Sequence, residues 1–543
     1  MTRARTWLMV GGAALALLVA CDRKPARTST TTLAVRVTDA TTNQPLGARV
    51  LLIDHDGNPL HIGTIDLYGK RQGAGACKFA PGVLGSWDGL ILADGSADIP
   101  IGADDCSPSP AIPYGSYTVW AWRGPEYNKW EGHVDIPAGG NVVPLNITLA
   151  RAWTPHGTLA ADLHVHAAAS NDSHVPNPQR VTAQVAAGVQ VIGLSDHNNN
   201  GDLAAEIASL NLSSVVTSIA SNELSSEAAH VGVYPVIVDA KAPQHGGPPP
   251  AQLEKASAQE LLRIARSLPG HPIVQVNHPR FRVTSMFDSL GWNGTSWPPP
   301  FPLDFDAVEV LNGHTAFNVT NDRRIDEAVR DFYTFTDRGF LVAPLGNSDT
   351  HHLNGVHDAL CRNYVFVDDP RIAPFDEAGF IEALRHRRVE ATSGPWLDVE
   401  VKTSDTASAS VGAGQALKLV RQPEQPAQVW VDVTLYQANF VHTDSIRIMV
   451  GSAQGPTVAQ TINVVANAPS THWAGWISVG AADTWLGVDA GGDTPLPIEL
   501  TGTYQIEKKR TGVTPFALIA PILLDVDGDD RWQRGTTNRD LTK

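Results

Sequence analysis

Short apolar runs alternate with stretches of helical periodicity between residues 151 and 395. Each run is nearly continuous in apolar residues, as expected of strands buried on both faces. The runs are VQVIGL, VVTSIA, HVGVYPVIV, PIVQV, AVEVL and FLVAPL. Helical spacing occurs in Ser257–Leu268, which opens with a capping box, and in Thr320–Arg338, which stops at Gly339. The alternation predicts a parallel, barrel-like sheet with crossover helices.

The segments on either side have a different pattern. Residues 33–150 contain short, alternating, β-branched runs punctuated by Gly, Asn and Pro, which predicts a β-sandwich. In pattern alone this segment is similar to the carboxypeptidase-regulatory-like and fibronectin-like modules of secreted enzymes. After Trp396 the runs LDVEVKT, VWVDVTLY, SIRIMVG and WLGVDAG predict a second β-rich domain over residues 396–543. The expected architecture is multidomain, with a central β/α barrel over residues 151–395 flanked by N- and C-terminal β-sandwich domains.

The first twenty residues have the pattern of an export signal. Arg3 and Arg5 precede an apolar run that is too short for a stable membrane span. The run ends in Leu-Val-Ala-Cys21, which resembles a bacterial lipobox, so residues 1–20 are predicted to be removed and Cys21 lipidated. Residues 21–32 would form a polar tether, and the lipid would anchor the protein in the bacterial cell envelope, at the periplasmic or extracellular face. A plain signal peptide with an incidental cysteine is the alternative.

Charge and cysteine content narrow the function classes. The net charge of -16 repels phosphate backbones and argues against a nucleic-acid partner. At 543 residues the chain is too long for one hydrophobic core. Cys77 and Cys106 could pair in an oxidising compartment, whereas Cys361 is predicted to be a small buried residue. None of the cysteines suggests a thiol nucleophile.

Histidines and carboxylates follow the predicted central strands. In this pattern the candidate ligands are His164, His166, His197, Glu223, His230, His278, Asp349 and His351. Because the carboxyl ends of barrel strands meet at one face, these side chains are predicted to converge. Alternate residues of an extended segment project to the same side, so His164 and His166 could hold one ion. Imidazole and carboxylate ligands together suit zinc, manganese or iron.

The order of these motifs resembles that of the PHP (polymerase and histidinol phosphatase) family of metallohydrolases. The motifs are DLHVH, SDHN, NEL, NHPR and NSDTH, and the resemblance covers about residues 158–395. Two further segments, TSGPWL and LLDVDGDD, are similar to the branch that contains carbaryl hydrolase. The resemblance implies a distorted, TIM-like barrel of seven strands that holds two or three divalent metal ions.

The resemblance also implies which side chains share an ion. Glu223 would bridge the first ion to the second, and Asp172 would join the ligands of the third. The implied groups are His164, His166, Glu223 and Asp349 for the first ion, Glu223, His230 and His278 for the second, and Asp172, His197 and His351 for the third.

The predicted reaction is hydrolysis by metal-activated water. A bound divalent ion lowers the pKa of its water towards neutrality, and such a centre can cleave a phosphoester or a carbamate or ester bond. Arg280 is a candidate for binding phosphate, while His174, His314 and His352 are candidates for proton transfer or for orienting ligands. Each of these histidines could equally be an exposed loop residue. The long loop 280–302 could be a lid over the site or a flap packed on a neighbouring domain.

Two alternatives to a hydrolase are compatible with the sequence. The chain could be a non-catalytic, lipid-anchored binding protein whose β-sandwich recognises a glycan or a partner and whose barrel is degenerate. The metal could also be purely structural, although structural sites rarely use so many ligand positions. The complete ligand set favours an enzyme that acts on a small-molecule substrate. The substrate class, the metal and the oligomeric state stay open.

Overall fold

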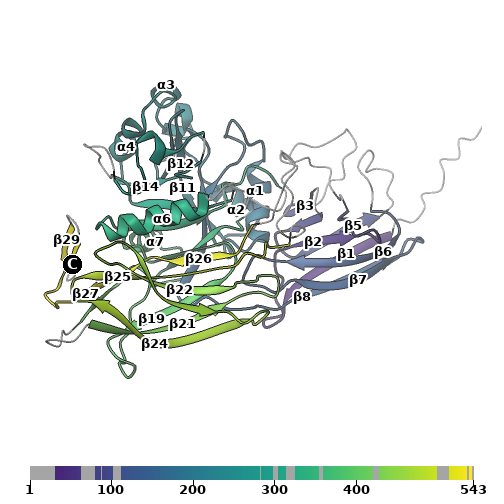
Figure 1. Cartoon of the computed structure of the whole chain (residues 1–543). Helices are drawn as coiled ribbons and strands as arrows, with labels where there is room; N and C mark the ends of the chain where they lie inside the picture. The colour runs from purple at the N-terminus through teal and green to yellow at the C-terminus, as the bar shows by residue number, and fades with distance from the viewer. Residues whose placement is uncertain are drawn as a thin grey trace, which may run out of the picture.

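The protein is β-rich, with several sheets and short connecting helices (Figure 1). The computed structural model describes residues 31–60, 62, 80–86, 89–101, 112–281, 283–296, 304–313, 324–353, 359–419, 427–497, 500, 513–534 and 537–540.

Three predictions concern residues outside these ranges: the lipidation of Cys21, the pairing of Cys77 with Cys106 and the candidate His314. Within the described residues, no helix is both long and apolar enough to cross a membrane.

Two sheets form the N-terminal region and share one apolar core (Figure 1). Their strand orders are β5-β1-β8 and β3-β4-β2-β6-β7. Along β1, Leu33, Val35 and Val37 are buried while the residues between them are less buried, as the two-residue period of a strand requires. The strands are β1 (Thr31–Asp39), β2 (Ala48–Ile53), β3 (Val83–Ser86), β4 (Gly89–Leu92), β5 (Ser96–Ile101), β6 (Gly115–Trp122), β7 (Trp130–Ile136) and β8 (Val142–Leu149).

One 11-stranded sheet, called the long sheet below, runs through the centre and the C-terminal half of the molecule. Its order is β11-β10-β9-β17-β18-β26-β25-β22-β23, with β27 beside β25 and β20 beside β27. β9, β10 and β11 are parallel, whereas β17 and β18 are antiparallel to their neighbours. Its strands are β9 (Thr158–Val165), β10 (Val191–Leu194), β11 (Thr217–Ala220), β17 (Arg362–Phe366), β18 (Val389–Thr392), β20 (Ala416–Lys418), β22 (Ser445–Val450), β23 (Thr457–Asn463), β25 (Thr484–Gly491), β26 (Phe516–Ile519) and β27 (Ile522–Asp525).

A five-stranded sheet, in the order β12-β13-β14-β15-β16, lies beside the parallel end of the long sheet. β16 contacts β9, β17 and β18. The first three strands pair antiparallel and the last three pair parallel. The strands are β12 (Asn222–Ser225), β13 (His230–Tyr234), β14 (Ile273–Val276), β15 (Ala307–Asn312) and β16 (Ala343–Asn347).

Short helices connect and cover these strands. The predicted cap at Ser257 is confirmed, because its hydroxyl accepts the N–H of Glu260 at the start of α4. α6 ends before Gly339, which has a φ of 87°, and its Tyr333 stacks on Trp485 of the long sheet with ring centroids 5.3 Å apart. The helices are α1 (Asn177–Ala186), α2 (Ala204–Ser209), η2 (Pro243–Gly246), α3 (Pro250–Leu253), α4 (Ala258–Ser267), α5 (Met286–Ser289), α6 (Arg324–Asp337) and α7 (Glu377–Arg385).

A three-stranded sheet, β19-β21-β24, packs on the C-terminal half of the long sheet. Val431 and Ile477 of this sheet share a core with Val488 of β25 and with Leu159 of β9. Apolar packing therefore continues from the central region into the C-terminal region. The strands are β19 (Trp396–Lys402), β21 (Ala427–Tyr436) and β24 (Ser470–Gly480), and a separate hairpin consists of β28 (Arg531–Arg534) and β29 (Thr537–Asp540).

The prediction of a TIM-like, seven-stranded β/α barrel between separate β-sandwiches is wrong. The central strands belong to two sheets, and β11 and β12 are in different ones. Among the described residues, isolated bridges connect the two sheets: His197, after β10, bridges to Glu223 of β12, and Val165 of β9 bridges to Thr350, after β16. Strand β18 of the long sheet pairs with the C-terminal strand β26. The long sheet therefore continues into the C-terminal region and does not close into a barrel with the five-stranded sheet. Continuous apolar runs indicate burial on both faces but specify neither the partner nor the direction of a strand, and this is why the pattern suggested a closed parallel sheet.

Candidate metal centre

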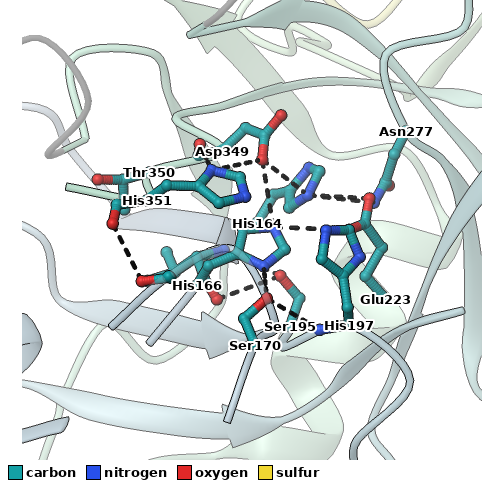
Figure 2. Close-up of polar contacts among 12 residues, drawn as sticks. His164, His166, Ser170, Ser195, His197, Glu223, Asn277, Asp349, Thr350 and His351 are labelled. Atoms are coloured by element: carbon teal, nitrogen blue, oxygen red, sulfur yellow. Dashed lines mark hydrogen bonds and ion pairs between the residues drawn. The ribbon is translucent and has the colours of Figure 1, made fainter. Parts of the chain in front are cut away.

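Nine histidine, aspartate and glutamate side chains lie together where the five-stranded sheet meets the parallel end of the long sheet. Figure 2 labels His164, His166, His197, Glu223, Asp349 and His351 of this cluster. Their potential ligand atoms form four groups, and within each group the atoms all lie within 4.8 Å of one another. The groups are His164, His166 and Asp349; His164, Glu223 and His278; His197, Glu223 and His230; and His166, Asp172, His197 and His351. The structure therefore brings together all nine residues that the sequence predicted as ligands.

Backbone hydrogen bonds explain how two distant ligand segments meet. β9 carries His164, and His166 follows one residue after the strand ends. The loop after β16 lies along this segment: the N–H of Asp349 donates to the carbonyl of His164 (2.9 Å), and the N–H of His166 donates to the carbonyl of Thr350 (3.1 Å). As a result, Oδ1 of Asp349 lies 3.2 Å from Nε2 of both His164 and His166.

Glu223 contacts five imidazoles, including that of His166, whose Nε2 lies 3.5 Å from its Oε2. Its Oε1 lies 3.1 Å from Nε2 of His164, 3.2 Å from Nδ1 of His230 and 3.4 Å from Nε2 of His278. Its Oε2 lies 2.8 Å from Nδ1 of His197. The antiparallel pairing of β12 with β13 brings His230, the first residue of β13, to the strand that carries Glu223. The two oxygens of one carboxylate thus face two sets of ring nitrogens.

Asp172 lies on the solvent side of the cluster. Its Oδ2 is 3.0 Å from Nε2 of His197 and 3.2 Å from Nε2 of His351. The Asp172 side chain is 48% exposed, whereas His164 and His166 are fully buried. Solvent therefore reaches the cluster from the Asp172 side.

Charge and burial act against each other on this outer group. Burial lowers the pKa of His197, but the carboxylates of Glu223 and Asp172 outweigh it and raise the pKa to about 10. Burial raises the pKa of Asp172, but the imidazoles of His197 and His351 hold it well below its usual value. Without metal, these side chains are charged partners at neutral pH.

The two buried imidazoles of the DLHVH motif differ in protonation. Burial opposes the charged form of His164, yet neighbouring carboxylates, foremost that of Asp349, raise its pKa well above the usual value. Burial, together with the charge on His351, lowers the pKa of His166 well below the usual value. His166 is therefore neutral, the form that a metal ion binds, whereas His164 would have to lose a proton first.

Several buried atoms of the cluster lack a hydrogen-bond partner. They are Nε2 of His166, Oε2 of Glu223, Nδ1 of His230 and Nδ1 of His278. Such atoms are costly to bury unless something else satisfies them. Six imidazoles and three carboxylates, without a thiolate, are a donor set that suits zinc, manganese or iron. The structure thus contains His/Asp/Glu groups that could bind metal ions.

Glu309, a buried carboxylate in β15, was not among the predicted site residues. Its Oε1 is hydrogen-bonded to Nδ1 of His164 (2.8 Å), and its Oε2 accepts the N–H of His278 (2.7 Å). A carboxylate in this position orients a ligating imidazole and directs its other nitrogen towards the metal. The signal was present in the run AVEVL, because a glutamate among buried apolar residues needs a partner.

Two neutral side chains, which were also missed, orient further members of the cluster. Nδ2 of Asn277 donates to Oε1 of Glu223 (2.8 Å). The hydroxyl of Ser170 is hydrogen-bonded to Nδ1 of His166 (3.0 Å) and donates to Oδ1 of Asp172 (2.9 Å). Both residues adjoin ligand motifs in the sequence, but asparagine and serine are too common in loops to stand out there.

The residues predicted to assist catalysis, Arg280, His174 and His352, are not members of the four ligand groups. Arg280 donates to Asp331 (2.6 Å) and Asp288 (2.5 Å), so its charge is already balanced by two carboxylates. His174 is exposed, and His352 is buried with its ring centroid 6.4 Å from that of His351. The structure thus places Arg280 between two carboxylates and the two histidines next to ligand segments.

The described part of the loop 280–302 is packed against α6. Nε1 of the buried Trp292 donates to Oδ1 of Asp331 in α6 (2.6 Å), and Phe287 lies edge-on to Phe335 with ring centroids 5.2 Å apart. Residues 282 and 297–302 lie outside the described residues. The described part thus packs on a helix of the same predicted domain, residues 151–395, and these contacts are not with a neighbouring domain.

A separate acidic group lies in the C-terminal region and consists of Asp483, Asp525 and Asp527. The carboxylate of Asp525 accepts the N–H groups of Gly528 (2.7 Å) and Asp530 (2.9 Å). Asp483 likewise accepts two backbone N–H groups. These hydrogen bonds describe a turn that is stabilised by the carboxylate of Asp525 from within and by that of Asp483 from another segment.

What the protein does has to be inferred from the cluster of nine side chains. No family model matches the chain, and no curated protein and no solved structure matches it significantly. The chain is thus characterised by a β-rich fold that contains buried His/Asp/Glu groups able to bind metal ions.

Proposed function

We propose that the protein is a metal-dependent hydrolase that acts on a small-molecule substrate. The observation that supports this most is the position of Glu223, whose Oε1 faces His164 and His278 while its Oε2 faces His197. A carboxylate between two sets of imidazoles is suited to bridging two metal ions, and paired ions are a recurrent device for hydrolysis. A single structural ion would not need this arrangement.

The cluster would hold two or three divalent ions of zinc, manganese or iron. When bound, they would supply a water of lowered pKa as the nucleophile and positive charge for the oxygens of the substrate. On the allocation that the motif resemblance implies, His164, His166, Glu223 and Asp349 would hold the first ion, Glu223, His230 and His278 the second, and Asp172, His197 and His351 a third. The ligand-atom groups of the structure differ in part from this allocation, because His278 groups with His164 and Glu223, and His230 with His197 and Glu223.

Other side chains would prepare this chemistry. Glu309 holds the ring of His164, and the full burial of that ring keeps bulk water from the inner side of the cluster. The half-exposed Asp172 leaves the outer side accessible to a substrate. His174 and His352 are the candidates for protonating the leaving group, because each lies within two residues of a ligand on this outer side.

Charge favours a phosphoester as the substrate over a carbamate. Three divalent ions would bring more positive charge than the nearby carboxylates of Glu223, Asp349, Asp172 and Glu309 cancel, whereas two ions would only balance them, so this preference rests on a centre of three ions. A net positive centre attracts the anionic oxygens of a phosphoester and stabilises charge that develops on them, whereas a neutral carbamate gains less. The resemblance of the motifs to PHP metallohydrolases agrees with this proposal. The resemblance to the branch of carbaryl hydrolase favours the carbamate, so both substrates belong in the test.

The test uses purified protein reconstituted with manganese or zinc. An aryl phosphate, a phosphodiester and an aryl carbamate are offered, and we expect hydrolysis of a phosphoester. The variant His164→Ala should lose this activity, while His133→Ala, at an exposed histidine beside Asp135 in the N-terminal region, should keep it. Equal activity in His164→Ala would contradict the proposal. If the metal-loaded protein hydrolyses none of the three, the non-catalytic binding protein becomes the better explanation.

A further inference from the structure

Arg180 of α1 ties two ligand-bearing segments together. Its side chain is fully buried. Nε donates to the carbonyl of His166 (2.9 Å), and Nη1 donates to the hydroxyl of Thr350 (2.9 Å) and to the carbonyl of His352 (3.0 Å). One guanidinium therefore spans the segment after β9 and the loop after β16, which also carries Asp349.

The shape of the guanidinium matters for this contact. Thr350 is fixed from both sides, because its carbonyl accepts the N–H of His166 (3.1 Å) while its hydroxyl donates to the carbonyl of His352 (3.2 Å). Arginine presents its donors in a rigid, planar fork that can meet several acceptors at once, whereas lysine offers a single compact ammonium group. The acceptors around Arg180 are thus matched to arginine in particular.

The N-terminal sheets hold α1 in place. Leu84 of β3 and Ile91 of β4 pack in one cluster with residues of α1 and with Leu353, which follows the ligand loop. Arg123, directly after β6, donates to the carbonyl of Val185 in α1 (2.7 Å). Figure 1 shows α1 beside these sheets. Support for the ligand segments therefore extends from the N-terminal sheets through α1 to Arg180.

We infer that Arg180 is a positioning residue of the metal centre, which sets His166 against Asp349 and His351, and that the N-terminal sheets support it through α1. This inference rests on the proposed metal centre, but not on any particular reaction. On this view the N-terminal region belongs to the metal-binding unit and is not an independent binding module. The ions that depend most on Arg180 are those held by His166, Asp349 and His351.

The test compares Arg180→Met and Arg180→Lys with a matched control, Arg534→Met. Like Arg180, Arg534 connects several segments by donating to main-chain carbonyls, those of Asp337 (2.8 Å), Asp483 (3.1 Å) and Ser452 (2.9 Å), but it lies in the C-terminal region. Affinity for manganese and zinc is measured by competition titration, the absorption spectrum of the cobalt-loaded protein reports ligand geometry, and thermal unfolding reports stability.

We expect Arg180→Met to lower metal affinity by about 10- to 100-fold and to change the cobalt spectrum. Arg180→Lys should show a smaller loss, and Arg534→Met should unfold at a lower temperature while keeping wild-type metal affinity. If Arg180→Met does not fold, the metal affinity and cobalt spectrum of Arg180→Lys decide whether Arg180 positions the ligands. Wild-type affinity and spectrum in the folded Arg180 variants, or an equal loss in Arg534→Met, would overturn the inference. A wild-type protein that binds no metal would instead overturn the proposed function itself.

Discussion

The two ends of the long sheet are stabilised in different ways. At the C-terminal end, Ile448, Leu486 and Val488 bury apolar side chains in a common core. At the other end, β9 and β10 lead into buried imidazoles and carboxylates. Apolar burial is favourable by itself, whereas buried charge is costly unless a partner compensates it. The C-terminal end should therefore be stable without metal, whereas the stability of the end that contains β9 and β10 should depend on bound metal.

β9 combines apolar burial on one face with buried polar and charged side chains on the other. Leu159, Ala161 and Leu163 face the apolar core, while the alternate residues Asp162 and His164 belong to the polar network of the metal centre. The apolar face anchors the strand in the sheet and so fixes the position of the ligands on the other face. The site can therefore contain buried, charged groups, because the apolar residues on the opposite face hold the strand in place.

The largest effect is expected from Glu223→Gln, at the carboxylate that contacts both sets of imidazoles. The substitution keeps the shape but removes the charge that would bridge two ions. We expect metal affinity to fall by more than the roughly 100-fold that loss of a supporting residue costs, and hydrolysis to become undetectable. Metal titration and steady-state kinetics on this variant and on His133→Ala measure the difference. Unchanged affinity in Glu223→Gln would refute the bridging role.

Leu486→Ala tests the apolar end of the sheet. Leu486 is completely buried, so its truncation should lower the free energy of unfolding by about 2–5 kcal/mol. The same loss should appear with and without added metal, and metal affinity should not change. Urea unfolding in the two conditions gives this comparison. A loss of metal binding in this variant would mean that the two ends are not independent.

Glu309→Gln should have an intermediate effect at the metal end. The amide would still fill the space beside His164, but it would no longer supply the charge that orients the ring. Metal affinity should therefore fall by about 10- to 100-fold while the fold is retained. Isothermal titration with manganese measures this change, with Glu260→Gln, at an exposed site on α4, as the matched control. Equal affinities in the two variants would remove Glu309 from the support of the site.

A smaller effect is expected from pH. The pKa of His197 is raised to about 10, so in the metal-free protein its charge stabilises the fold fully below pH 6.5, and this contribution is lost as the pH rises through 10. A metal ion requires the neutral imidazole and must displace that proton. Apparent metal affinity should therefore rise by about tenfold per pH unit for each displaced proton between pH 6.5 and 10. Calorimetry in buffers of different ionisation enthalpy counts the protons released, and a count of zero would contradict this assignment.

Eight residues of the cluster could be predicted because their motifs are local and stand next to apolar runs that the sequence displays, as SDH follows VQVIGL. Asp172 has no such run beside it and was predicted only through the resemblance to the PHP family. The closed barrel could not be predicted correctly, because closure depends on pairings between remote segments. The clearest case is the pairing of β18 with β26, in which Ala391 lies opposite Leu518. Nothing in the sequence of either strand identifies the other as its partner.

Supporting contacts were harder to predict than ligands. Arg280 was predicted to bind phosphate because a guanidinium can donate two hydrogen bonds to anionic oxygens, but it is paired with Asp331 and Asp288 instead. Asp331 is distant in the sequence, and nothing in the sequence marks Asp288 as its partner. Arg180 stands in a helix whose role only the structure reveals. Residues that act through main-chain carbonyls leave no pattern in the sequence, because every residue has a carbonyl.

The most direct test of the account is the metal content of the purified protein after loading with manganese or zinc and removal of the excess, measured by elemental analysis. The account predicts at least two tightly bound equivalents in the wild type and a loss of bound metal in the double variant His164→Ala/His166→Ala. No bound metal in the wild type, or the same amount in the double variant, would contradict it.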